Sequence, residues 1–187
     1  MTKRLAAWIV GASVALGNVG HAEASETFWD WFFSVKRMKE VAPVNDAAYN
    51  EECGSCHFPY QPGFLPAASW QKLLDAKALA DHFGDSAELD ETTRKHLLEF
   101  AVANSAEKSY YKRARKVIAS LKKGDAPLRI TDVPYIKDKH GKLPAQDVKD
   151  NPKVKSLSYC NKCHLKAEEA TFDDDTVAIP GKGPWSW

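Results

Sequence analysis

Two short stretches of the chain carry residue types that can hold a metal-containing group. Each stretch reads C-x-x-C-H, and the six residues of the two motifs are Cys53, Cys56, His57, Cys160, Cys163 and His164. Two thiols three positions apart lie about one helical turn from each other, so both can reach one porphyrin. This is the attachment pattern of a c-type haem, in which the following His supplies the proximal ligand of the iron. We therefore expect two covalently bound haem c groups, which use every cysteine of the chain.

Three other chemistries use paired cysteines. The cysteine pairs of a zinc ribbon usually lie ~15–20 residues apart, whereas more than a hundred positions separate Cys56 from Cys160. A redox C-x-x-C is expected beside a βαβ pattern, which this sequence lacks, and it needs no following His. Two disulfides would leave the His after both pairs unexplained. The doubled motif therefore favours haem over these alternatives.

The first residues are typical of an export signal. Lys3 and Arg4 precede a short apolar run that ends at Leu16, and this run is shorter than the ~20 residues that span a bilayer. We expect a signal peptide over residues 1–22, with cleavage after Ala22 or, alternatively, after Ala24; an uncleaved anchor is the rival interpretation. Cleavage after Ala22 changes the net charge from +1 to −1. Export agrees with c-type haem attachment, which takes place outside the cytoplasm, so we expect a periplasmic protein that is not integral to the membrane.

The rest of the chain predicts a mainly α protein. The 187 residues and their near-zero net charge fit one or two small globular domains and give no nucleic-acid signal. Asn45 or Asp46 can cap a helix that leads into the first motif, and further helices are expected from Ser69 to Phe83, from Asp90, and over residues 106–123. Helical periodicity is poor after Gly124. We therefore place an N-terminal haem domain at residues 23–124 and a smaller, irregular C-terminal haem domain at residues 125–187.

The sixth ligand of each iron decides what a haem can do, because an open position permits catalysis and a filled one favours electron transfer. Met38 is the one methionine left after cleavage, and it precedes the first motif. Three histidines remain for two irons. We expect His82, near a helix end and a glycine, to serve the first haem, and His140 to serve the second. His96 lies within a predicted helix, so a surface or core position is favoured for it, although a ligand role and crossed pairing stay open.

Two irons with imidazole on both sides would have low reduction potentials, because methionine ligation raises the potential relative to two histidines. Such irons leave no place for a substrate. The protein would then act as an outer-sphere electron carrier, in which an electron enters one haem and leaves from the other to a docked partner.

The sequence resembles a known family, the bacterial dihaem cytochromes c. The likeness covers nearly the whole mature chain and is carried by the stretches Glu52–His57, Pro62–Pro66 with Trp70, Ala80–Asp85, Pro127–Thr131, His140, Cys160–His164 and Phe172–Asp175. It implies a class I cytochrome c-like N-terminal domain, an irregular C-terminal domain and two low-spin haems of low potential. It also implies a membrane cytochrome b as electron donor and a small oxygen-binding monohaem cytochrome c as acceptor. We expect the protein itself to be a monomer.

Two other functions remain open as alternatives, a dihaem peroxidase-like enzyme and a haem-based sensor. Both need an open or exchangeable iron site, so binding of carbon monoxide distinguishes them from a carrier. A further hypothesis concerns one helix face, whose cationic side chains could dock an acidic redox partner or be simply solvated. These side chains are Lys108, Lys112, Arg113, Arg115, Lys116, Lys122 and Lys123.

Overall fold

The computed structural model describes residues 40–185, so the predicted signal peptide and Met38 lie outside the described residues. The α-helices are α2 (Ala47–Gly54), α3 (Ala67–Leu73), α4 (Ala76–Ala80), α5 (Glu91–Ala103), α6 (Lys112–Ser120) and α7 (Pro134–His140). The 3-10 turns are η1 (Pro62–Phe64), η2 (Ala106–Lys108), η3 (Ile130–Asp132), η4 (Ala145–Asp147), η5 (Cys160–Lys162), η6 (Ala167–Glu169) and η7 (Asp174–Thr176). The strands are β1 (Ala178–Ile179) and β2 (Gly183–Pro184), which pair antiparallel. The mainly α prediction is confirmed.

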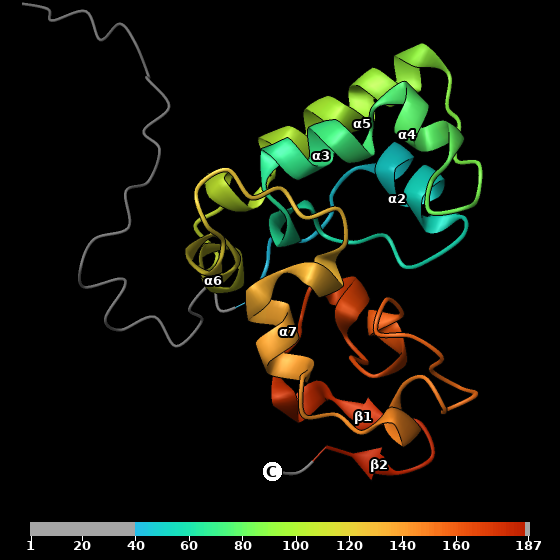
Figure 1. The fold of residues 1–187 in the computed structure, drawn as a ribbon, viewed down its shortest axis with the longest axis vertical. Helices are drawn as coiled ribbons and strands as arrows, with labels where there is room; N and C mark the ends of the chain where they lie inside the picture. Colours follow the sequence, from blue (N-terminus) through green and yellow to red (C-terminus); the bar gives the residue numbers. More distant parts are fainter. Residues whose placement is uncertain (1–39, 186–187) are drawn as a thin grey trace, which may run out of the picture. The chain divides into compact units, whose positions relative to one another are not determined.

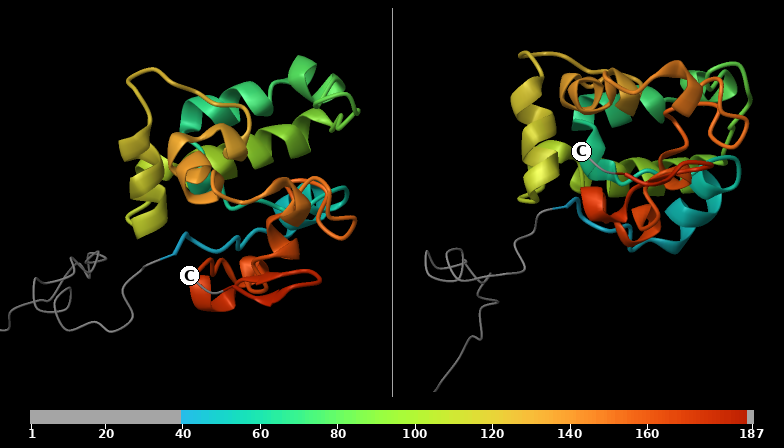
Figure 2. Two further views of the ribbon diagram at one scale, coloured as in Figure 1. Left: turned by 60° about the horizontal axis from the view of Figure 1, so that its bottom comes forward. Right: turned by 90° about the horizontal axis from the view of Figure 1, so that it is seen from below.

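Helices α2 to α5 lie together at one end of the described part, and the β1–β2 hairpin lies at the other (Figures 1 and 2). One hydrophobic core joins residues from both sides of Gly124. Leu65 and Val117 belong to it, and so do Val133 and Phe172. The division into two haem domains at Gly124 stays a prediction. Between residues 40 and 185, no helix combines the length and apolar composition that crossing a membrane requires.

Two predicted helix starts are confirmed. The Asp46 carboxylate accepts a hydrogen bond from the backbone N–H of Tyr49 at 2.8 Å and so caps α2, the helix that ends in the first motif. The Asp90 carboxylate caps α5 in the same way, by accepting from the N–H groups of Thr92 and Thr93. A carboxylate at this position satisfies N–H groups that have no partner within the helix.

The other two helices are shorter than predicted. Ser69 does not cap α3; it is buried inside the helix, which ends at Leu73. Asp75 then starts α4, because its carboxylate accepts from the N–H of Lys77 at 3.0 Å. The predicted helix over residues 106–123 is instead the turn η2 followed by α6. Short polar side chains that bond to nearby backbone compete with helix continuation, and periodicity alone does not reveal this.

The loop after the first motif is part of the core. Residues 61–66 are all buried, and they include the turn η1. A Cβ atom at Gly63 would lie 2.7 Å from the side-chain methyl Cγ2 of the buried Val41, so the packing of Val41 against this turn leaves no room for a side chain at position 63. The loop thereby holds the first motif against the interior of the protein.

Candidate haem-binding sites

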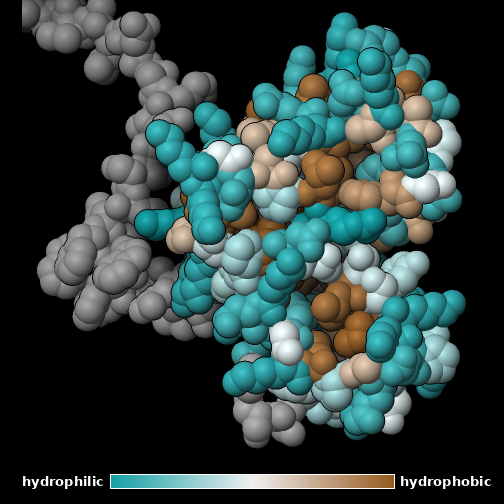
Figure 3. Space-filling model, in the orientation of Figure 1, coloured by the Kyte–Doolittle hydropathy of each residue, from teal (hydrophilic) through white to brown (hydrophobic). Residues whose placement is uncertain are grey.

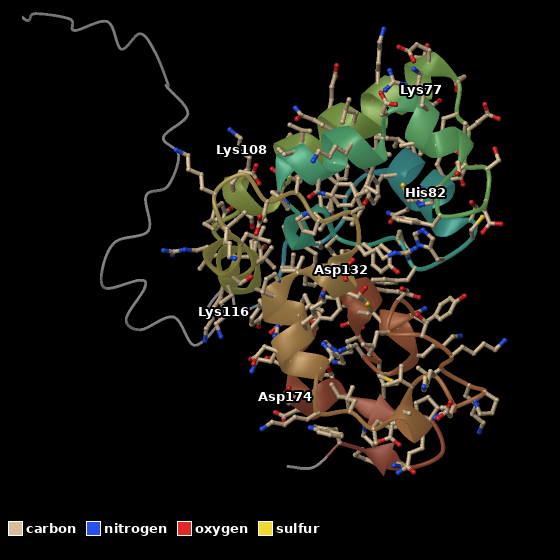
Figure 4. The ribbon with its side chains drawn as sticks, in the orientation of Figure 1. Lys77, His82, Lys108, Lys116, Asp132 and Asp174 are labelled. Carbon is tan, nitrogen blue, oxygen red and sulfur yellow. The ribbon has the colours of Figure 1, made fainter. Side chains whose placement is uncertain are left out.

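The first site brings His57 and His82 together. His57 follows the end of α2, and His82 lies in the turn after α4 (Figure 4). The centres of the two imidazole rings are 6.4 Å apart, and their planes differ by 16°. Both histidines lie just after the end of a helix, as the sequence predicted, and the fold brings these two helix ends together.

A tight turn orients His82. Phe83 and Gly84 both have positive φ angles, 61° and 104°, and the carboxylate of Asp81 accepts a hydrogen bond from the N–H of Gly84 at 3.0 Å. The N–H of His82 donates to the carbonyl of Asp85 at 2.7 Å, which closes the turn. The glycine near His82 thus has a conformational role, because two successive left-handed residues are costly without one.

The second site brings His140 and His164 together. His140 is the last residue of α7, and His164 follows the turn η5. Their ring centres are 6.1 Å apart, and the ring planes differ by 71°. The expectation that His140 lies in an irregular segment is wrong, since a short helix carries it.

Both separations match the size of a metal-centred imidazole pair. An imidazole nitrogen lies about 2.0 Å from a bound metal and about 1.1 Å from its own ring centre, so two imidazoles on opposite sides of one metal have centres about 6 Å apart. The four histidines fall into two such pairs. In Figure 3, apolar residues gather in two patches on one face, one near α3 and one beside α7. Each pair also contains the His of a C-x-x-C-H motif, so the residues present fit a haem at each pair.

Hydrogen bonds set the proton position on two of the imidazoles. Nδ1 of His57 lies 2.8 Å from the carbonyl of Phe58, and Nδ1 of His140 lies 2.8 Å from the carbonyl of Ile136. A carbonyl only accepts, so in each ring Nδ1 carries the proton and Nε2 keeps a free lone pair. Nδ1 of His164 is buried and has no hydrogen-bond partner among the described residues.

The environment keeps two of the rings neutral. Burial, reinforced by His57 and Arg129, lowers the pKa of His82. Burial, followed by His140 and Arg113, lowers the pKa of His164 to about 4. A metal binds the neutral form of imidazole, so both shifts favour ligation at neutral pH.

No disulfide joins the four cysteines of the two motifs, all of which lie within residues 40–185. Burial raises the pKa of Cys53 to about 12 and that of Cys160 to about 11. A redox-active dithiol needs a lowered pKa instead, so the structure does not favour that alternative. Within residues 40–185, no three His, Cys, Asp or Glu side chains gather as a metal cluster such as a structural zinc site would need.

His96, the third candidate ligand, lies apart from both pairs. Its Nε2 is 2.8 Å from a carboxylate oxygen of Asp46, and its side chain is 54% exposed. It therefore bonds to the residue that caps α2.

Sequence reasoning missed two groups of residues. Arg113, counted above with a solvated cationic face, lies half-buried: its guanidinium bonds to the carboxylate of Glu40 at 2.8 Å and to the carbonyl of Phe172 at 2.8 Å. The guanidinium of Arg129 lies 3.9 Å from the ring centre of Phe83, next to His82. Neither partner is close in sequence, so spacing gave no signal; only the resemblance singled out the segment of Arg129.

Comparisons with known proteins identify the family of the chain. The sequence model of the dihaem cytochrome c family matches residues 49–172. A diheme cytochrome type c from Shewanella baltica OS155 is 37% identical, with 75% of this chain and 97% of that chain covered and a TM-score of 0.61. A diheme cytochrome c from Rhodobacter sphaeroides is also 37% identical, with 70% and 98% covered and a TM-score of 0.61. Comparison with curated proteins gave no match. The chain therefore belongs to the dihaem cytochrome c family and carries two covalently bound c-type haems.

Proposed function

We propose that the protein is a low-potential electron carrier in which His57 and His82 bind one haem iron and His140 and His164 bind the other. The observation that supports this most strongly is the separation of the ring centres, 6.4 Å and 6.1 Å, in two pairs that each contain the His of a C-x-x-C-H motif. Family membership supports electron transfer as the activity.

The chain's own residues act as ligands and as an enclosure. The haems supply one-electron redox chemistry. Cys53 and Cys56 would hold one of them and Cys160 and Cys163 the other, and each histidine pair would supply the ligands of one iron. Neutral imidazole is a strong donor that favours a low potential and leaves no coordination site for a peroxide or a gas.

Carbon monoxide tests this proposal. Adding the gas to the fully reduced protein should leave the Soret band unchanged, because neither iron has an open position. Prompt binding at one haem would contradict the proposal and favour the alternative, a peroxidase-like enzyme or a sensor. Myoglobin, reduced and measured in the same way, serves as the positive control for binding.

We further propose a periplasmic location, with a membrane cytochrome b as donor and a small oxygen-binding monohaem cytochrome c as acceptor. The predicted signal peptide and the family resemblance support this. Stopped-flow mixing of the reduced protein with such an acceptor should show rapid oxidation, whereas the acceptor remaining oxidised would contradict the assignment.

Arg129 is expected to raise the potential of the first haem. Its positive charge lies close enough to His82 to lower the pKa of that residue, and a nearby cation favours the reduced state of an iron site. Arg129→Gln should lower the midpoint potential of one haem by about 50 mV, which is ~1 kcal/mol for a one-electron couple. Arg129→Lys, which keeps the charge, should change it much less. Equal shifts in both variants, measured by spectroelectrochemistry, would contradict the electrostatic explanation.

A further inference from the structure

Two adjacent residues of the loop after the first motif reach both sides of the second motif. The hydroxyl of Tyr60 donates a hydrogen bond to the carbonyl of Ser158, two residues before Cys160. The side-chain amide of Gln61 donates to the carbonyl of Ala167 at 2.8 Å, three residues after His164. Gln61 is 1% exposed, so this second contact is fully interior.

Tyr60 also contacts the first candidate site. Its ring stacks on the imidazole of His57, with centres 5.0 Å apart and planes 30° apart. The hydroxyl of Tyr49, a residue of α2, donates to the backbone carbonyl of Tyr60 at 2.7 Å. The side chain of Tyr60 therefore makes two contacts. The face of its ring contacts an imidazole of the first site, and its hydroxyl contacts the segment that leads into the second motif.

The polar end of Tyr60 is held as a donor. The carbonyl of Ser158 can only accept a hydrogen bond, so the phenol of Tyr60 is the donor in this contact. Near the hydrogen bond between Tyr60 and Ser158, residues of both motifs line one surface cavity of about 320 Å³. Its lining includes Cys56 and His57 from the first motif and Asn161 and Lys162 from the second.

We propose that Tyr60 is a positioning residue for electron exchange between the two haems. This inference rests on the proposed carrier function. In the exchange, a single electron moves between the two irons, one being oxidised as the other is reduced, and no bond or proton changes at Tyr60. Tyr60 acts by fixing the second attachment segment against the imidazole of the first site, because transfer between reacting centres is sensitive to small displacements.

Two substitutions separate the parts of this role. Tyr60→Phe keeps the ring against His57 and removes the hydrogen bond to Ser158, and Tyr60→Leu removes both. Exchange spectroscopy by nuclear magnetic resonance on the half-reduced protein should show interhaem exchange slowed severalfold in Tyr60→Phe and further in Tyr60→Leu. In the fully oxidised protein, the dipolar broadening that each iron causes in the signal of the other should change in the same order. Tyr110→Phe makes the same chemical change at a side chain that is 68% exposed and should change neither quantity.

An unchanged exchange rate and unchanged broadening in both Tyr60 variants would overturn the proposal. A lower free energy of unfolding with unchanged exchange would assign Tyr60 a purely structural role and would overturn it too. Neither result would contradict the proposed carrier function as long as both haems stay low-spin and do not bind carbon monoxide. Binding of carbon monoxide by the unsubstituted protein would instead contradict the carrier function itself.

Discussion

Replacing His82 with alanine is expected to convert one of the two haems from the low-spin to the high-spin state. The imidazoles of His57 and His82 have centres 6.4 Å apart, the spacing of two ligands on one metal. Alanine provides no donor atom, so the iron of the first motif would keep only His57 and would gain an open position. About one equivalent of carbon monoxide should then bind to the reduced variant, as measured by the change in its Soret band.

Two matched variants complete this experiment. His140→Ala should have the same effect on the other haem, because His140 pairs with His164 at 6.1 Å. His96→Ala should leave both haems low-spin, since the exposed imidazole of His96 bonds to Asp46 instead. A high-spin haem in the His96 variant, or two low-spin haems in the His82 variant, would show that the pairing proposed here is wrong.

Replacing Arg113 with methionine is expected to lower the free energy of unfolding by about 3 kcal/mol. The side chains of Arg113 and Glu40 are only 19% and 15% exposed, and their ion pair is 2.8 Å long. The same guanidinium donates to the carbonyl of Phe172, and the Glu40 carboxylate also accepts from the N–H of Phe172 at 2.7 Å. Methionine preserves much of the volume but leaves a half-buried carboxylate and a carbonyl without their cation.

Arg115→Met is the control for this substitution, because Arg115 lies two residues away on α6 and is exposed. Its effect on the free energy of unfolding should stay within about 0.5 kcal/mol, as for most surface changes. Chemical denaturation of both variants, followed by far-ultraviolet circular dichroism, gives the comparison. Equal losses in the two variants would mean that the Glu40–Arg113 pair does not stabilise the fold.

The sequence was most informative where chemistry depends on residues that are close in the chain. The two C-x-x-C-H motifs predicted the haems of the family, Asp90 was correctly predicted as a helix cap, and Asp46 was one of the two candidates for the cap of α2. In each case the groups involved lie within four residues of one another, so spacing alone determines whether they can meet.

Contacts between distant segments could not be predicted in this way. Arg113 follows the pattern of an exposed cationic face, yet it pairs with Glu40, 73 positions earlier. Tyr60 and Ser158 are 98 positions apart and meet only because the loop after the first motif is packed into the core. The angles between the paired imidazoles are also a product of tertiary packing. Such features depend on which of many apolar surfaces are buried together, and a single sequence does not specify this locally.

Electron paramagnetic resonance of the oxidised, unsubstituted protein at low temperature tests the central claim most directly. The angle between two axial imidazole planes controls the splitting of the iron d orbitals, and the two pairs differ, at 16° and 71°. We predict two low-spin signals of equal intensity: a rhombic one from the nearly parallel pair of His57 and His82, and a strongly anisotropic one from the crossed pair of His140 and His164. A high-spin signal that accounts for one of the two haems would contradict the account.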